Sequence, residues 1–94
     1  MRIEWLRNAL RNLDTEASYI AQDNPAAARA FVSAVLTDVA LLAANPAAGR
    51  EGRVPGTREW AMSSHPYLIP YRIRGGRLQV LRIFHIRRLP PVRW

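Results

Sequence analysis

The chain has 94 residues, no cysteine and a formal net charge of +7 at pH 7, and arginine fills all 14 of its Lys and Arg positions. This length allows one small domain over residues 1–94, and the lack of cysteine excludes disulfides and thiolate chemistry, argues against a zinc site and suits the cytoplasm. Arginine stays protonated near pH 7, so these side chains can bind anions but cannot act as general bases.

Two helices are predicted in the first half of the chain, after a short strand over residues 2–5. The first follows the i, i+3, i+4 spacing of an amphipathic helix, with apolar side chains at Leu6, Ala9, Leu10, Leu13, Ala17, Ile20 and Ala21. Asn24 is placed to cap a second helix, which begins at Pro25, where the missing N–H costs nothing, and ends near Asn45. The longest apolar stretch of that helix is interrupted by Ser33, Thr37 and Asp38, so we expect a helical hairpin and no membrane span.

The second half of the chain is predicted to be β-rich. A glycine- and proline-punctuated loop over residues 49–56 precedes three strands, over residues 57–63, 67–74 and 77–86. Gly75 and Gly76 form a two-residue hairpin signal that places Arg74 opposite Arg77. Pro70 cannot donate a ladder hydrogen bond, so we expect it at an edge or a bulge.

The hairpin register also predicts which side chains share a face of the sheet, because side chains alternate along each strand. The face toward the helices would carry Tyr67, Ile69, Tyr71, Ile73, Leu78, Val80, Arg82 and Phe84. The other face would carry Leu68, Pro70, Arg72, Gln79, Leu81, Ile83 and His85. This second face is mixed and basic, and we expect it to be open.

Positive charge is concentrated in the second half of the chain. Ten of the 14 arginines lie at or after Arg50, where the only carboxylates are Glu51 and Glu59, and the first 49 residues are close to neutral. Such a field attracts phosphate backbones or acidic protein segments, and the binding weakens with salt. A solvated surface in an arginine-rich proteome would show the same bias. The residues expected to contact a partner are Arg50, Arg58, Arg72, Arg82, Arg87, Arg88, Arg93 and Trp94.

The sequence His85-Ile86-Arg87-Arg88 ends the last predicted strand and is the leading candidate for chemistry. Two arginines can clamp a phosphate and a histidine titrates near neutrality, so this cluster could position RNA for cleavage. A histidine at a strand end is also often a hydrogen-bonded cap or part of a protein interface. Neither His85 nor His65 has a carboxylate at a metal-ligand spacing, so we expect no metal and no cofactor.

Several pieces of the sequence occur in an order typical of one protein family. They are IEW with ALRNL near the start, NPAAA opening the second helix, NPAAGR at its exit, GTREW entering the sheet, PYLIPYRI in the middle strand and VLRIFHIRR at the end. In these pieces the chain resembles the RelE/ParE toxins of type II toxin–antitoxin systems over nearly its whole length.

The resemblance implies an α+β fold of order β-α-α-β-β-β, in which the helical hairpin packs on a small, mainly antiparallel sheet. It also implies a growth-inhibiting toxin, of a kind linked to plasmid stabilisation, held silent in a hetero-oligomer by a cognate antitoxin. Because the sheet half is basic, we expect the antitoxin to contribute an acidic, partly disordered segment that folds onto the helices and the sheet.

The family divides by target, and this chain departs from one branch. The mRNA-cleaving RelE-like members carry basic residues along the second strand and after the tyrosine of the third, where this chain has Glu59, Ala61 and Leu68. The terminal aromatic of some nuclease members is Trp94 here, which has no hydroxyl to donate. The resemblance to the nuclease branch is therefore incomplete.

Three hypotheses for function follow. The His-x-Arg ending of the last strand resembles the ParE branch, whose members bind DNA gyrase without covalent catalysis, and we favour this hypothesis. A ribosome-dependent mRNA endoribonuclease would instead need His85 as acid or base, with Arg72, Arg87 and Arg88 stabilising the developing charge. A non-toxic binding module is the third.

Overall fold

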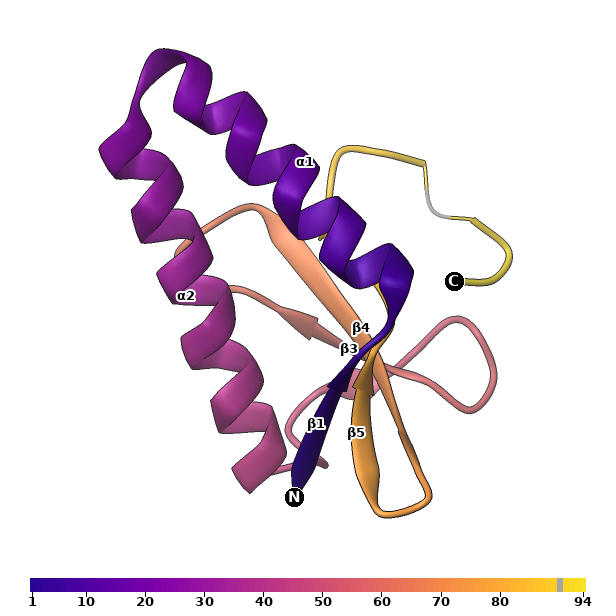
Figure 1. The fold of residues 1–94 in the computed structure, drawn as a ribbon. Coiled ribbons are helices and arrows are strands. Elements are labelled where there is room, and N and C mark those ends of the chain that lie inside the picture. Colours follow the sequence, from indigo (N-terminus) through magenta and orange to yellow (C-terminus); the bar gives the residue numbers. More distant parts are fainter. Residues whose placement is uncertain (90) are drawn as a thin grey trace.

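The computed structural model of this chain describes residues 1–89 and 91–94. The elements, in order, are β1 (Arg2–Trp5), α1 (Arg7–Asp23), α2 (Pro25–Ala44), β2 (Arg50–Glu51), β3 (Arg58–Ala61), β4 (Tyr67–Arg74), β5 (Arg77–Val80) and β6 (Phe84–His85). The predicted α+β order of a strand, a helical hairpin and a β-rich half is confirmed (Figure 1). Two details differ, because β2 lies inside the predicted loop and the predicted last strand is divided into β5 and β6.

The turn between the helices follows the predicted capping chemistry. The Asn24 side chain accepts a 3.0 Å hydrogen bond from the backbone N–H of Ala27, and Pro25 occupies the first turn of α2. At the other end of α2, the N–H of Asn45 bonds to the carbonyls of Leu41 and Leu42. Both ends of α2 are therefore where the sequence placed them.

One side of α2 supplies much of the hydrophobic core. Phe31, Val35, Val39 and Leu42 are almost fully buried against the sheet. The sequence predicted no membrane span, yet by length and composition alone α2 would pass as one, with a mean hydropathy of 1.7. A buried core helix has the same apolar composition as a membrane span. The apolar side chains of α2 pack in the hydrophobic core. α1 is less buried than its pattern predicts, since Leu10 is 51% exposed.

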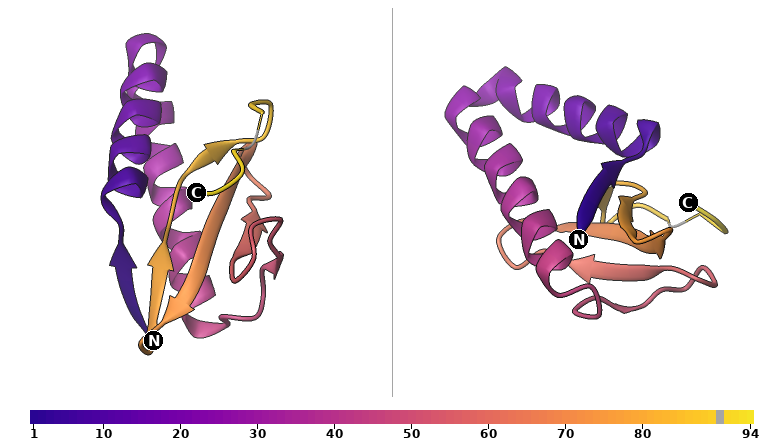
Figure 2. Two further views of the ribbon diagram at one scale, coloured as in Figure 1. Left: turned by 90° about the vertical axis from the view of Figure 1, so that its right-hand side faces the viewer. Right: turned by 60° about the horizontal axis from the view of Figure 1, so that its bottom comes forward.

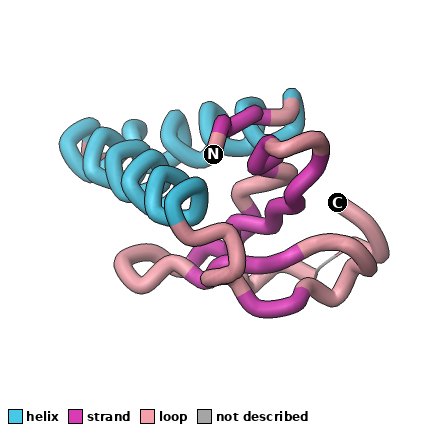
Figure 3. The backbone as a smooth tube through the Cα atoms, turned by 90° about the horizontal axis from the view of Figure 1, so that it is seen from below, coloured by secondary structure: helices cyan, strands magenta, loops and turns pink. Residues whose placement is uncertain are grey.

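The sheet has the strand order β1-β5-β4-β3-β2, with β6 pairing to β4. β1 runs parallel to β5, and the other pairs are antiparallel. The two helices lie together on one side of this sheet (Figures 2 and 3). At the β4–β5 hairpin the predicted register is confirmed, with Arg74 opposite Arg77 and Tyr71 opposite Val80. Gly75 and Gly76 both have positive φ, as a tight hairpin turn of this kind requires.

Further along, the register changes by one residue. β4 advances three residues from Tyr71 to Leu68, while the opposing segment advances four, from Val80 to Phe84. This extra residue is a β-bulge, and it lies beside Pro70, whose carbonyl accepts a 2.9 Å hydrogen bond from Leu81. In an antiparallel pair the N–H and C=O of one residue point the same way, so the missing N–H of Pro70 faces the interruption. Of the two expected places for Pro70, an edge or a bulge, the structure has the bulge.

The bulge overturns part of the predicted facing pattern. Tyr67 lies opposite His85 and not opposite Phe84. Ile83 is 2% exposed within the core, whereas the Phe84 ring packs edge-on against Trp94 and the Arg82 side chain bonds to the Trp94 backbone oxygen. His85 and Ile83 therefore lie on the helix side, where Phe84 and Arg82 were expected, because one inserted residue inverts the alternation.

The helix-free face is also less open than predicted. Leu68, Pro70 and Leu81 are buried on it, and Gln79 is nearly so. Part of this cover comes from the end of the chain, since Trp94 contacts Phe84 and lines a pocket together with Leu81. The apolar residues of this face therefore pack beneath later segments of the chain, which leaves mainly its arginines at the surface.

Tyr71, at the centre of β4, ties the exit of α2 to the sheet. Its hydroxyl donates to the Pro46 carbonyl at 2.7 Å and accepts from the Gly49 N–H at 2.9 Å, and the residue is fully buried. A Cβ at Gly49 would lie 2.6 Å from this hydroxyl, so only glycine fits there. One phenol thus satisfies two backbone groups of the chain leaving α2.

We expect Tyr71→Phe to lower the free energy of unfolding by about 2 kcal/mol, because it leaves two buried backbone groups without their partner. Urea denaturation followed by circular dichroism measures this difference. Tyr19→Phe is the matched control, since Tyr19 is 70% exposed. Equal stability of the two variants would show that the Tyr71 hydroxyl contributes nothing to the fold.

Candidate functional site

The predicted catalytic cluster lies where β6 ends beside α1. The His85 ring packs edge-on against Tyr67, with 5.0 Å between the ring centroids, and His85 is half-buried. Its Nδ1 accepts a 3.1 Å hydrogen bond from the backbone N–H of Arg87. This bond caps the turn after β6 and leaves Nε2 as the nitrogen that can carry a proton or meet another molecule.

Beneath His85 lies a buried carboxylate from α1. Glu16 is 6% exposed, accepts a 2.7 Å hydrogen bond from the Tyr67 hydroxyl, and forms a 3.1 Å ion pair with Arg88. Burial raises the pKa of Tyr67, and the hydrogen bond to the negatively charged Glu16 raises it further, so this phenol stays protonated and acts as a donor. The ion pair between Arg88 and Glu16 therefore holds α1 to the end of the sheet.

Sequence reasoning missed Glu16 and Tyr67 as a pair. A signal was present, because Glu16 falls three residues after Leu13 and four before Ile20, on the apolar side of α1. A carboxylate inside an apolar stripe needs a buried partner. The partner could not be chosen from the sequence, because it lies 51 residues away.

An open groove of about 460 Å³ lies over this cluster, lined among others by Tyr19, His85, Arg87 and Arg88. The Arg87 side chain makes no hydrogen bond or ion pair within the described residues. No group of three His, Cys, Asp or Glu side chains able to hold a metal ion occurs in the described part of the chain. What the groove offers is the guanidinium of Arg87, the exposed but ion-paired guanidinium of Arg88, one imidazole nitrogen and an aromatic rim.

The remaining predicted contact residues are not gathered at one site. Arg50 pairs with Glu59 at 3.3 Å, and Arg58 donates to the Gly49 carbonyl at 2.8 Å. Arg82 is tied to Trp94. Trp94 lies between two pockets, one lined by Arg72, Arg74 and Arg93 and the other by Arg82 and Arg88. Several arginines that the charge count assigned to a partner therefore hold the chain itself.

Glu59 organises the loop between β2 and β3. It is 1% exposed and receives hydrogen bonds from the backbone N–H of Arg53 at 3.1 Å, from the Arg53 side chain, and from Arg50. Burial by itself would raise its pKa, but these hydrogen bonds outweigh burial, and the pKa of Glu59 lies below its ordinary value. Where the nuclease branch has a basic residue, this chain has a buried carboxylate.

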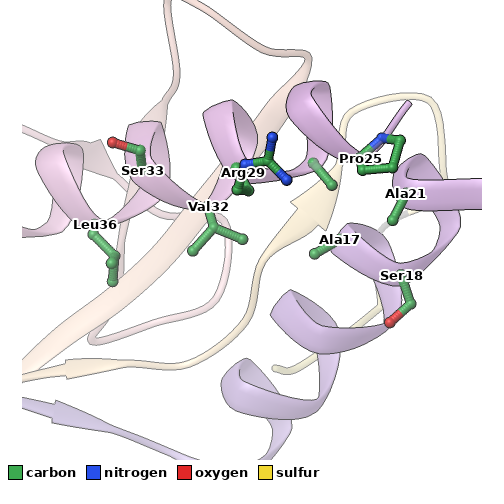
Figure 4. Close-up of a pocket in the computed structure, with 9 residues that line it drawn as sticks. Ala17, Ser18, Ala21, Pro25, Arg29, Val32, Ser33 and Leu36 are labelled. Carbon is green, nitrogen blue, oxygen red and sulfur yellow. The ribbon is translucent and has the colours of Figure 1, made fainter.

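A second concave surface, which the sequence did not predict, lies between the two helices on their outer side. This interhelical groove has a volume of about 580 Å³. It is lined by Ala17, Ser18 and Ala21 of α1 and by Pro25, Arg29, Val32, Ser33 and Leu36 of α2, and Val32 points toward Ala17 (Figure 4). Small residues on α1 and the wide apolar surface of α2 create it. Leu36 stays 49% exposed at its edge, so apolar surface is available here.

Three comparisons with known proteins agree on one family. The family model described as "ParE toxin of type II toxin-antitoxin system, parDE" matches residues 3–90. A protein of Sinorhizobium fredii named "Putative toxin Y4kP" is 44% identical over 84 residues, which cover 89% of this chain and 86% of that protein. A solved structure from the chromosomal ParDE toxin–antitoxin system of P. aeruginosa has 32% identity and a TM-score of 0.82, and the match covers 92% of this chain and 96% of the other.

The buried carboxylate of the β2–β3 loop gives a pH prediction. Because the folded-state pKa of Glu59 is below its ordinary value of 4.5, ionised Glu59 stabilises the fold above that pH, and this stabilisation is lost as the pH falls through 4.5 and then through the folded-state value. We expect Glu59→Gln to be about 2 kcal/mol less stable than the parent at neutral pH. The gap should narrow as the pH falls below 4.5.

Thermal unfolding between neutral and acidic pH measures this gap. The control is Glu51→Gln, because Glu51 is exposed in the neighbouring strand and makes no ion pair within the described chain. A gap that is constant with pH, or equal for both variants, would contradict the role given to Glu59.

Proposed function

We propose that this chain, which belongs to the ParE toxin family of type II toxin–antitoxin systems, arrests bacterial growth by binding DNA gyrase and not by cleaving RNA. We further propose that it acts in the cytoplasm, where a cognate antitoxin neutralises it. The observation that carries the choice of target is the state of the groups around His85. Three of the four that a nuclease would need, His85, Arg88 and Arg72, also make contacts that hold the fold.

Three contacts support this reading. Nδ1 of His85 is occupied by the N–H of Arg87, and Arg88 is paired with the buried Glu16. Of the other nuclease candidates, Arg87 lines the same groove as His85 with its side chain unbonded among the described residues, while Arg72 lines a different pocket and bonds to Gln79. Acid–base cleavage of RNA requires an acid, a base and charge-stabilising groups around one phosphate. His85, Arg87 and Arg88 line one groove, but His85 and Arg88 are already bonded within the fold and Arg72 lies at another pocket. A protein target needs only an accessible, complementary surface.

The antitoxin is the partner that the family and the ParDE relative support. We propose that its acidic segment covers two surfaces of this chain. Apolar side chains would enter the interhelical groove, which has exposed Leu36 at its edge, and carboxylates would meet the arginines on the helix-free face. The resulting complex is a toxin–antitoxin hetero-oligomer, and its affinity falls with salt because charge pairing contributes.

The first test is a short pulse of expression in bacteria lacking the antitoxin, with growth and new RNA 5′ ends followed together. We expect growth arrest without new 5′ ends, and loss of supercoiling activity when purified toxin is added to DNA gyrase. New ends clustered inside translated codons would instead establish a ribosome-dependent nuclease. Harmless expression of folded protein would favour a non-toxic binding module.

A second test uses His85. If the chain acts by binding, His85→Gln should stop growth at about the same toxin level as the parent, because glutamine can still accept the Arg87 hydrogen bond. If His85 were the acid or base of a nuclease, its loss should reduce activity about 100-fold or more. Circular dichroism of the purified variant shows whether it is folded, and the expression level that halves the growth rate is the readout.

A further inference from the structure

The helix-free side of the sheet carries a pocket of about 310 Å³ that none of the contacts described so far explains. It lies between the start of α1, the loop before β3, the β4–β5 hairpin and the end of the chain, which run close together in Figure 1. Arg72, Arg74 and Arg93 line it, and no Asp or Glu side chain does. The side chains of the pocket therefore concentrate positive charge.

The guanidinium of Arg72 is held in place by a chain of hydrogen bonds across the sheet. Its Nε donates to Gln79 at 2.6 Å, and the Gln79 amide donates to Glu4 at 2.9 Å, which links β4, β5 and β1. The terminal nitrogens of Arg72 are not used by these bonds. Arg74 and Arg93 form no hydrogen bond or ion pair with any described residue. The guanidinium of Arg72 is thus held in position, and those of Arg74 and Arg93 are available to bind an anion.

The pocket also has an apolar component and one buried polar atom without a partner. Leu6, Leu81 and Trp94 are among its lining residues. The indole Nε1 of Trp94 is buried and has no hydrogen-bond acceptor among the described residues. Buried donors normally have partners, so this indole N–H is an unsatisfied group of a residue in the pocket wall.

We propose that this pocket binds a carboxylate side chain of the antitoxin. An aspartate or glutamate enters between Arg74 and Arg93, meets the fixed Arg72, and an adjacent apolar residue of the same segment packs on Leu81 and Trp94. The inference rests on the proposed antitoxin partner. We take the occupant to be a peptide because the antitoxin is a protein, and the phosphate measurement below tests the nucleic-acid alternative.

The main test measures affinity for the antitoxin that co-purifies when the toxin and antitoxin genes are expressed together. Arg74→Gln and Arg93→Gln should each weaken its binding at least about tenfold, and their binding should depend less on salt than that of the parent. Arg11→Gln, an exposed arginine of α1, is the matched control and should bind as the parent does. Parent-like affinity in both pocket variants would overturn the proposal.

A second measurement locates the ligand. The Trp94 indole N–H, assigned by comparison with Trp94→Phe, is one of three in the chain and reports on the pocket by NMR. Acetyl-leucyl-glutamate amide should shift this resonance, and acetyl-leucyl-glutamine amide should not. A shift with inorganic phosphate but not with the glutamate peptide, at equal ionic strength, would show a phosphate site and refute the carboxylate assignment.

Growth arrest and gyrase inhibition are measured separately on the parent without antitoxin. If gyrase is not inhibited but the pocket variants still lose antitoxin affinity, the gyrase target is wrong and the pocket stands. If gyrase is inhibited and the variants bind antitoxin normally, the pocket assignment is wrong and the gyrase target stands.

Discussion

Pro70 is the constraint on which the arrangement of both faces of the sheet depends. It lies in β4, a central strand, where every residue is expected to exchange hydrogen bonds with its neighbours, and it has no N–H to give. The opposing segment accommodates this by one extra residue between Val80 and Phe84. That insertion turns Ile83 and His85 toward the helices and leaves Phe84 outside to receive Trp94. A single missing donor thereby decides which side chains reach α1 and which meet solvent or the end of the chain.

Fewer arginines are available to bind a partner than the net charge suggests. Glu16 and Glu59 are both almost fully buried, and together they engage Arg88, Arg50 and Arg53. A buried carboxylate is tolerated only with such partners, so these arginines are required by the fold before any target is considered. The arginines that remain without internal partners are the better guide to binding. A net charge of +7 describes the long-range field, while the distribution of unpaired guanidiniums describes the contact surface.

Local signals in the sequence were sufficient for the two helices, the caps of α2 and the β4–β5 hairpin. Asn24 with Pro25, and the Gly75-Gly76 turn, act over a few residues, and the structure has both as expected. An edge or a bulge was expected at Pro70, but the effect of the bulge on side-chain direction was not, because a periodic pattern cannot show where an extra residue is inserted. Contacts between distant segments were also out of reach. The bond from Tyr67 to Glu16 spans 51 residues, and no spacing rule in the sequence selects one carboxylate among several.

The two concave surfaces differ in a way that constrains the partner. The interhelical groove is apolar and broad, while the pocket beside Trp94 is cationic and small. A rigid globular partner would have to match both surfaces on opposite sides of the fold, whereas an unfolded segment can run from one to the other and order as it binds. Ordering such a segment opposes binding by several kcal/mol, about 2 to 5 for coupled folding, so apolar burial in the groove must supply most of the affinity. If the pocket binds an acidic side chain as proposed, charge pairing there would fix direction and register, because an acidic side chain placed one residue away would leave the pocket unfilled.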